Sequence, residues 1–253
     1  MTVTAASIIE ELKLFSDPVK AEHHQSFFKT GPGEYGEGDI FIGVTVPNMR
    51  KTAKAAYSEI SMNEVEKLIS SPIHEHRQTV LFILVGKYNA AAKSDLNLSK
   101  RNEIAAFYLA HLKFINNWDL VDSSASYIIG SLFLVTEPET LGRKTLQTLS
   151  KSNDLWEQRI SVMITHAFIK NGIFEPTLDL CEYFLSAKHD LMHKCTGWML
   201  REIGKKDTNV LLRFLNKHAE IMPRTMLRYS IEKLTPEEKE YYMKAGRKNK
   251  MQK

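Results

Sequence analysis

Trp118 and Asp122 are the residues whose types and spacing best suit chemistry at a cleft. They stand four residues apart in the segment NNWDLVD, so a helix would present the indole and the carboxylate on one face. Asp119 falls away from that face and, with Asn116 or Asn117, suits the start of a helix as a polar cap or a dipole-facing acid. Asp122 is then the carboxylate without a structural task. The signal is weak alone, because tryptophans of helical proteins usually pack in the core.

Two further tryptophans lie close to arginines. Trp156 and Arg159 occur in LWEQR, and Trp198 and Arg201 occur in GWMLRE. We expect Trp156 to pack in the core, with a place at the rim of a cleft as the alternative. Cys195 lies near Trp198 but has no base beside it, so we expect a buried thiol.

The sequence does not favour a metal or a cofactor. The closely spaced histidines lack neighbouring cysteine pairs, and the pair at helical spacing lacks the glutamate of a zinc-binding HExxH helix; these histidines are His23, His24, His74, His76, His189 and His193. We expect them to cap helices, face phosphates or lie on the surface. The glycines of residues 31–38 follow no expected strand, so a phosphate-cradling loop is disfavoured.

The elements that must position these residues are predicted to be helices almost throughout. Apolar residues recur at steps of three and four, and strand-like alternation is nearly absent. Turn signals divide the segments, among them Asp17-Pro18, Asn171-Gly172 and Met222-Pro223. The stretch 30–39, with four glycines and a proline, is predicted to be the one long loop. The fold class is therefore all-α.

A weak repeat indicates how the helices are arranged. Cations precede apolar stretches at Arg77, Arg159, Lys194 and Arg224, and the last three are separated by 35 and 30 residues, the length of HEAT-like helical hairpins. Such hairpins stack into a curved superhelix, and we expect a single domain over residues 1–253 with the cations lining one concave face. The alternative is that any helical protein gives loose spacings of this kind.

Charge is segregated along the chain. Residues 1–192 carry 19 Lys and Arg against 23 Asp and Glu, whereas residues 193–253 carry 15 against 7, a net of +8. A basic segment on a mildly acidic body suggests a polyanionic partner, most commonly nucleic acid. Residues 244–253 alone hold five cations, and we expect them to form a flexible tail that alternatively serves solubility only.

The chain is expected to be a cytoplasmic, soluble protein. Its apolar runs fall well short of the roughly 20 residues that a membrane-spanning helix needs. The first fifteen residues contain Glu10 and Glu11 where a secretory signal would be basic. Two cysteines, Cys181 and Cys195, suit a reducing compartment.

At NNWDLVD, LWEQR and GWMLRE the chain resembles the AlkD-like DNA alkylation-repair glycosylases, and FIGVTVPNMRKTAK resembles that family's N-terminal FLGxxxPxxR stretch. The likeness spans about residues 15–235. It implies a superhelix of HEAT-like repeats that hydrolyses the N-glycosidic bond of cationic purines such as 3-methyladenine and 7-methylguanine in duplex DNA. It also implies that the lesion is held without flipping the base out of the duplex.

The resemblance assigns roles to residues. It makes Asp122 the catalytic carboxylate, Trp118 and Trp198 the aromatic walls around the lesion nucleotide, and Arg159 and Arg201 contacts to nearby DNA. Asn117 stands where the family often has a second aromatic residue, so the preferred lesion can differ.

Three other cations complete the expected DNA surface: Lys194, Arg224 and Arg50. Arg50 follows Pro47 at an expected helix start and has a solvated face as its alternative. We expect a monomer bound to alkylated double-stranded DNA, without metal or cofactor. The alternatives are a non-catalytic relative that binds distorted or branched DNA, and a protein–protein scaffold.

Overall fold

The computed structural model describes residues 3–93 and 97–248. The chain forms two compact units, Met1–Ile128 and Ile129–Lys253. Every regular element within the described residues is helical, and one isolated backbone bridge joins Ile40 to Ile73. The all-α prediction is confirmed. That the whole chain acts as a single domain stays a prediction.

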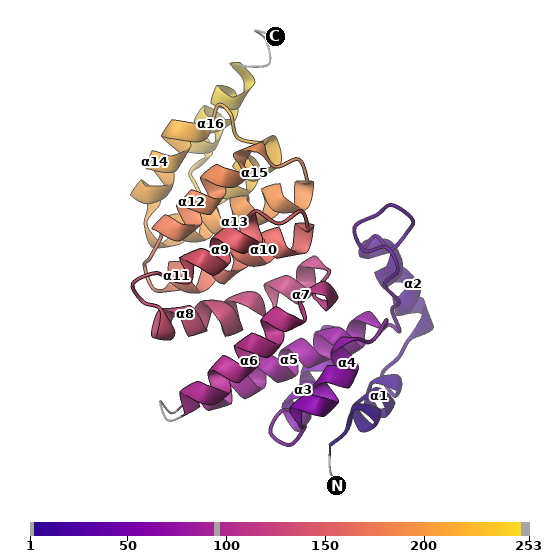
Figure 1. The fold of residues 1–253 in the computed structure, drawn as a ribbon. Coiled ribbons are helices and arrows are strands. Elements are labelled where there is room, and N and C mark those ends of the chain that lie inside the picture. Colours follow the sequence, from indigo (N-terminus) through magenta and orange to yellow (C-terminus); the bar gives the residue numbers. More distant parts are fainter. Residues whose placement is uncertain (1–2, 94–96, 249–253) are drawn as a thin grey trace. The chain divides into compact units, whose positions relative to one another are not determined.

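The first unit is built around one buried helix, α5. This helix packs against α3, α4, α6 and α7, and α1 packs against α3 and α4 (Figure 1). The helices of this unit are α1 (Ala5–Lys13), α2 (Pro18–Phe27), α3 (Val46–Ala56), α4 (Met62–Ile69), α5 (His74–Ala91), α6 (Leu98–Ala110) and α7 (Trp118–Asp122), with a 3₁₀ turn at Leu112–Phe114.

Helix α5 is buried from its first residue through residue 84. Its middle contains the apolar run 80–84, in which four of the five side chains are at most 1% exposed. Its first residues, 74–79, are polar, and none of them is more than 3% exposed. Buried polar groups must find hydrogen-bond partners inside the protein. We therefore expect a network of hydrogen-bonded polar groups at the first turn of α5.

The second unit is arranged around α13, which packs against α10, α12, α14 and α15. Gly197 permits the close approach of α13 to α15, because a Cβ there would lie 2.5 Å from the Met226 carbonyl oxygen. A π-helical turn, Ser126–Gly130, runs from the first unit into the second. The helices of this unit are α8 (Ser131–Thr136), α9 (Arg143–Ser150), α10 (Leu155–Ile164), α11 (His166–Lys170), α12 (Glu175–Tyr183), α13 (Asp190–Lys206), α14 (Thr208–His218), α15 (Arg224–Ser230) and α16 (Pro236–Lys248), with a 3₁₀ turn at Phe184–Ser186.

The predicted turn signals mark real helix ends. Asp17 caps α2 through its carboxylate, with Pro18 as the first helical residue. Gly172 follows α11 with a φ of 78°, and Pro223 precedes α15. The loop predicted at 30–39 contains no helix. Helices adjacent in sequence pack on one another, as in α9 with α10 and α12 with α13, which agrees with helical hairpins.

The end of the chain differs in part from its prediction. Residues 244–248 continue helix α16, because the helix that begins at Pro236 extends through them, whereas residues 249–253 of the predicted flexible tail lie outside the described residues. None of the described helices is long and apolar enough to cross a membrane.

Candidate functional site

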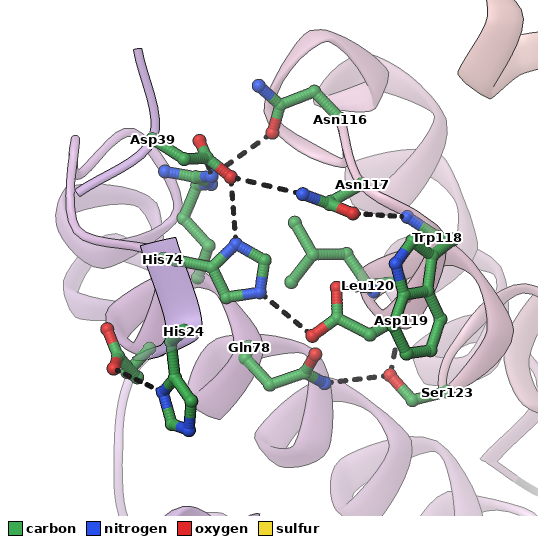
Figure 2. Close-up of polar contacts among 12 residues, drawn as sticks. His24, Asp39, His74, Gln78, Asn116, Asn117, Trp118, Asp119, Leu120 and Ser123 are labelled. Carbon is green, nitrogen blue, oxygen red and sulfur yellow. Dashed lines mark hydrogen bonds and ion pairs between the residues drawn. The ribbon is translucent and has the colours of Figure 1, made fainter. Parts of the chain in front are cut away.

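His74 is the centre of a buried ionic network at the start of α5. Its side chain is 1% exposed; its Nδ1 lies 2.9 Å from Asp39 Oδ2, and its Nε2 lies 2.8 Å from Asp119 Oδ2 (Figure 2). Burial lowers the pKa of His74, but the charges and hydrogen bonds of Asp119 and Asp39 outweigh burial and raise this pKa to about 9. Both ring nitrogens therefore donate, and His74 is a cation at neutral pH.

Arg77 completes the network one turn along α5. Its Nη2 donates to Asp39 Oδ1 at 2.5 Å and to Asn116 Oδ1 at 3.1 Å, and its Nη1 donates to the Ser71 carbonyl at 2.9 Å. Burial raises the pKa of Asp39, but the bonds from His74 and the charge of Arg77 lower it below the ordinary value overall. Asp39 therefore stays ionised between two cations.

The glycine-rich loop delivers Asp39 to this network. The loop folds back on the end of α2, where the Gly36 N–H donates to the Lys29 carbonyl at 2.9 Å. A Cβ at Gly36 would collide with the Phe28 carbonyl oxygen. Glycine is thus required at this close approach, and the loop has a structural task that the sequence did not indicate.

A stack of rings joins Trp118 to His74. Trp118 stacks on Phe28 with centroids 5.3 Å apart, Phe28 stacks on Phe41 at 4.9 Å, and Phe41 stacks on His74 at 4.4 Å. Asp119, the neighbour of Trp118 on α7, is hydrogen-bonded to His74. The contacts therefore form a closed loop. The loop holds the indole of Trp118 in place through the Trp118 ring itself and through Asp119, the next residue.

A pocket of about 340 Å³ opens beside this stack. Phe27 stands at it with 55% of its surface exposed and meets Trp118 edge to face, with centroids 6.1 Å apart. The residues that line the pocket come from α2, the segment before α3, and α3, α5 and α7: His23, His24, Phe27, Phe28, Phe41, Val44, Thr45, Val46, Met49, His74, Glu75, Trp118 and Asp119.

Glu75 fixes the segment that precedes α3. Its carboxylate is 1% exposed and accepts the backbone N–H groups of Ile42, Gly43 and Val44 at 2.8 to 3.2 Å. His24 Nδ1 lies 3.8 Å from the same carboxylate. Charge-assisted bonds of this kind hold one wall of the pocket in place.

Helix α7 forms as predicted and carries both Trp118 and Asp122, which are half-buried. Asn117 is its N-cap, and the Asn117 Oδ1 accepts the Trp118 N–H at 2.9 Å. Burial raises the pKa of Tyr108, and the nearby negative charge of Asp122 acts in the same direction.

Asp119 has the expected role at the start of the helix and a second role that was not expected. Its Oδ1 accepts the N–H of Leu120 at 2.9 Å, which is helix-start chemistry, but its Oδ2 binds His74. The helical spacing alone did not show a partner from α5, 45 residues earlier in the chain.

In the second unit, Trp198 is half-buried on α13. Its Nε1 donates to Glu202 Oε1 at 2.9 Å, and its ring lies 5.7 Å from that of His166. Burial, aided by the charge of Lys170, lowers the pKa of His166 to about 4. A neutral imidazole therefore accompanies the indole at neutral pH.

The predicted cations have protein partners. Arg201 pairs with Glu232, Lys194 Nζ lies 2.8 Å from Asp190, and Arg224 Nη1 donates to the Met243 carbonyl at 3.2 Å. In the first unit, Arg50 is exposed and its guanidinium lies 4.0 Å from the centroid of the Phe82 ring.

Two of the cations expected along one exposed face are buried instead. Arg77 is 3% exposed and Arg159 is 4% exposed. Arg77 is held by Asp39, and the Arg159 Nη1 donates to the Leu191 carbonyl at 2.7 Å. Buried guanidinium groups require such partners. At these two positions the arginines therefore form hydrogen bonds inside the protein and do not line an exposed face. The buried states expected for Trp156 and Cys195 are confirmed.

Asp39, Phe28 and Phe41 were not predicted as site residues. The expectation that His74 caps a helix, faces phosphates or lies on the surface is wrong, because its side chain is buried between Asp39 and Asp119. The run HEHRQ directly before an apolar helical stretch was the available signal, since polar residues on a buried helix require partners. Within the described ranges, no group of three or more His, Cys, Asp or Glu residues is placed to hold a metal ion.

Comparison with known proteins identifies the family. The model of a family described as DNA alkylation repair enzyme matches residues 8–234, so the chain belongs to this family, and the resemblance seen in its motifs is confirmed. A solved structure described as a predicted DNA alkylation repair enzyme from Enterococcus faecalis is similar, with a TM-score of 0.67 and 13% sequence identity, covering 87% of this chain and 97% of that one. At this identity the likeness shows the fold alone.

The crystal structure of AlkD2 from Streptococcus mutans is also similar, with a TM-score of 0.47 and 16% identity over 96% of both chains. No curated protein matches the sequence.

Proposed function

We propose that this member of the DNA alkylation repair family is a glycosylase for positively charged alkylated purines, such as 3-methyladenine and 7-methylguanine, in duplex DNA. The observation that carries the proposal is helix α7. It holds Trp118 in a stack of aromatic rings and presents Asp122 one turn later. The family match over residues 8–234 supports DNA as the substrate.

The chemistry of the lesion explains why so few groups suffice. A purine alkylated at N3 or N7 is a cation and leaves as a neutral base, so it needs no acid to protonate it. Positive charge develops instead on the deoxyribose. The carboxylate of Asp122 stabilises this oxocarbenium-like sugar electrostatically and orients or deprotonates the attacking water.

The aromatic and basic residues hold the substrate. The faces of Trp118, in the first unit, and of Trp198, in the second, are each able to attract a cationic nucleotide, at about 0.5–2 kcal/mol depending on desolvation. Whereas Arg159 is 4% exposed and bonded to the Leu191 carbonyl and is left out of the DNA-binding surface, Arg201 binds phosphates of the DNA, with Lys194, Arg224 and Arg50 as further phosphate contacts. For Arg201 and Lys194 this means exchanging a carboxylate partner, Glu232 or Asp190, for a phosphate.

The test is release of 7-methylguanine and 3-methyladenine from methylated duplex DNA, compared between the wild-type protein and Asp122→Asn. We expect at least a tenfold loss in the variant, equivalent to about 1.4 kcal/mol of transition-state stabilisation. Asp179→Asn, at an exposed aspartate of α12, is the control and should retain the wild-type rate. Circular dichroism establishes that all three proteins are folded.

Two other results would replace the proposal. No release above the spontaneous rate, together with DNA binding that weakens steeply as salt rises, would indicate a non-catalytic DNA-binding relative. Weak and salt-insensitive binding would indicate a protein–protein scaffold.

A further inference from the structure

The first unit contains a second pocket, which shares no residue with the pocket beside Trp118. Its volume is about 470 Å³, within the roughly 300–1,000 Å³ typical of sites for small ligands. Lys87, on its wall, follows His74 by 13 residues on α5 and so lies about 20 Å further along the helix axis. The lining residues come from the end of α3, the start of α4, the second half of α5 and the start of α6: Tyr57, Ser58, Met62, Lys87, Ala90, Ala91, Asn97, Lys100, Glu103 and Ile104. The proposed reaction uses none of them.

Lys87 brings to this pocket an ammonium group that lacks a partner. The residue is half-buried, and its side chain makes no hydrogen bond or ion pair with the described residues. Burial lowers the pKa of Lys87, and the negative charge of Glu103 offsets this effect only in part. An ammonium group that loses water without gaining a partner is unfavourable, and a bound anion would remove that cost.

The charges around the pocket also favour an anion. Lys100 is exposed at the first turn of α6 and has no ion-pair partner in the described part of the chain. Among the described residues that line the pocket, Glu103 is the one carboxylate. Arg101, the residue after Lys100, is 5% exposed and donates to the neutral hydroxyl group of Tyr88 at 3.0 Å. Two lysines therefore stand against one carboxylate in the lining, and Arg101 adds a further positive charge between α5 and α6.

The other lining residues suit an anion with several oxygens and an organic body. Tyr57, Ser58 and Asn97 supply hydroxyl and amide donors, and their side chains have no hydrogen-bond partner within residues 3–93 and 97–248. A phosphate group presents three acceptor oxygens and up to two negative charges, so it can use both lysines and these donors together. The rest of the lining is apolar and suits the organic part of a ligand: Met62, Ala90, Ala91 and Ile104.

We propose that this second pocket binds a small organic phosphate, with the phosphate group between Lys87 and Lys100 and the organic part against the apolar side chains. The ligand is a small molecule and not DNA, because Lys87 is half-buried within the pocket, where a small molecule has better access than the backbone of a duplex. The inference goes beyond the proposed function and does not depend on it, since it uses no residue of the site around Trp118.

The first experiment measures binding of phenyl phosphate to the full chain by isothermal titration calorimetry. At neutral pH this probe joins an apolar ring to a phosphate group that is mostly a dianion. Inorganic phosphate and benzyl alcohol are the comparison ligands, because each offers only one of the two parts. We expect phenyl phosphate to bind at least fivefold more tightly than either, with an affinity that falls as salt rises.

Two variants test where the probe binds. Lys87→Met keeps the apolar stem of the side chain but removes its charge, and should weaken phenyl phosphate binding at least tenfold, equivalent to about 1.4 kcal/mol. Ala90→Phe, which fills the pocket from α5, should weaken it to a similar extent. The matched control is Lys54→Met, at an exposed lysine of α3 that is not among the lining residues, and it should bind like wild type. Circular dichroism establishes that each variant is folded.

The second experiment distinguishes a small phosphate from the phosphates of DNA. An excess of duplex DNA should leave the affinity for phenyl phosphate within twofold of its value without DNA. Lys87→Met should bind duplex DNA, and release 7-methylguanine from it, within twofold of wild type. Absence of base release by every form of the protein would refute the glycosylase and leave the second pocket standing.

Four results would overturn the proposal for the second pocket. Equal binding of phenyl phosphate and benzyl alcohol would show that the phosphate group is not recognised, and equal binding of inorganic phosphate would show the same for the organic part. No binding of phenyl phosphate, or binding that Lys87→Met leaves unchanged, would exclude this pocket as the site. Displacement of phenyl phosphate by duplex DNA, with weaker DNA binding by Lys87→Met, would assign the two lysines to a DNA-binding surface instead.

Discussion

Replacement of His74 by glutamine should destabilise the protein in a way that depends on pH. The folded-state pKa of His74 is raised from 6.5 to about 9, a difference of about 2.5 units. At 1.36 kcal/mol per unit this corresponds to about 3 kcal/mol of stability from the protonated imidazole. The side chain is 1% exposed, so solvent screening reduces this figure little.

The sign of the pH dependence follows from the direction of the shift. Because the folded pKa is raised, the contribution is fully present below about pH 6.5 and is lost as pH rises towards 9. Between these values the folded state holds a proton that the unfolded state lacks. The difference in the free energy of unfolding between wild type and His74→Gln should therefore shrink by about 1.4 kcal/mol per pH unit in this window.

The assay is equilibrium urea unfolding at several pH values between 6 and 10, followed by circular dichroism and tryptophan fluorescence. Coincidence of the two signals establishes that one transition is measured. His23→Gln, at an exposed histidine of α2, is the matched control and should change stability by no more than about 0.5 kcal/mol. A difference between wild type and His74→Gln that stays constant from pH 6.5 to 9 would refute the reasoning, as would NMR titration of the His74 ring near pH 6.5.

Two further substitutions test the packing of each unit. Glu75→Gln should lower the free energy of unfolding by about 2–4 kcal/mol, since an uncharged amide has one oxygen for the backbone N–H groups of residues 42–44; a loss below 1 kcal/mol in urea unfolding would contradict this. Gly197→Ala should cost about 1–3 kcal/mol, because its Cβ would lie 2.5 Å from the Met226 carbonyl oxygen and 2.6 Å from the Tyr229 Cβ. A melting temperature equal to that of wild type would show that α13 and α15 adjust without cost.

The helices were predictable because their signals are local. Asp17 before Pro18 and Gly172 after an apolar stretch each act within one turn of the chain, by capping or by adopting a positive φ. The shared helix of Trp118 and Asp122 follows from their spacing of four residues. Family motifs then supplied candidate roles that spacing alone could not.

The ionic network was not predictable, because its members come from distant parts of the chain. Asp39 lies 35 residues before His74, and Asp119 lies 45 residues after it. Periodicity places a residue on a face of its own helix but carries no information on which other helix that face meets. The spacing of cations led to a wrong prediction at Arg77 for the same reason. The sequence does not distinguish a buried arginine from one that faces DNA, because it does not show the partner of the side chain.

The network gives two carboxylates of the short helix α7 different tasks. Asp119 is neutralised by His74 and, through the ring stack, helps to hold Trp118. The negative charge of Asp122, one turn later, adds to the burial that raises the pKa of Tyr108. Loss of Asp119 should therefore resemble loss of His74, because either change frees one side of the same loop of contacts around the indole. Loss of Asp122 leaves that loop intact, so a defect confined to base release would separate chemistry at Asp122 from positioning by Asp119.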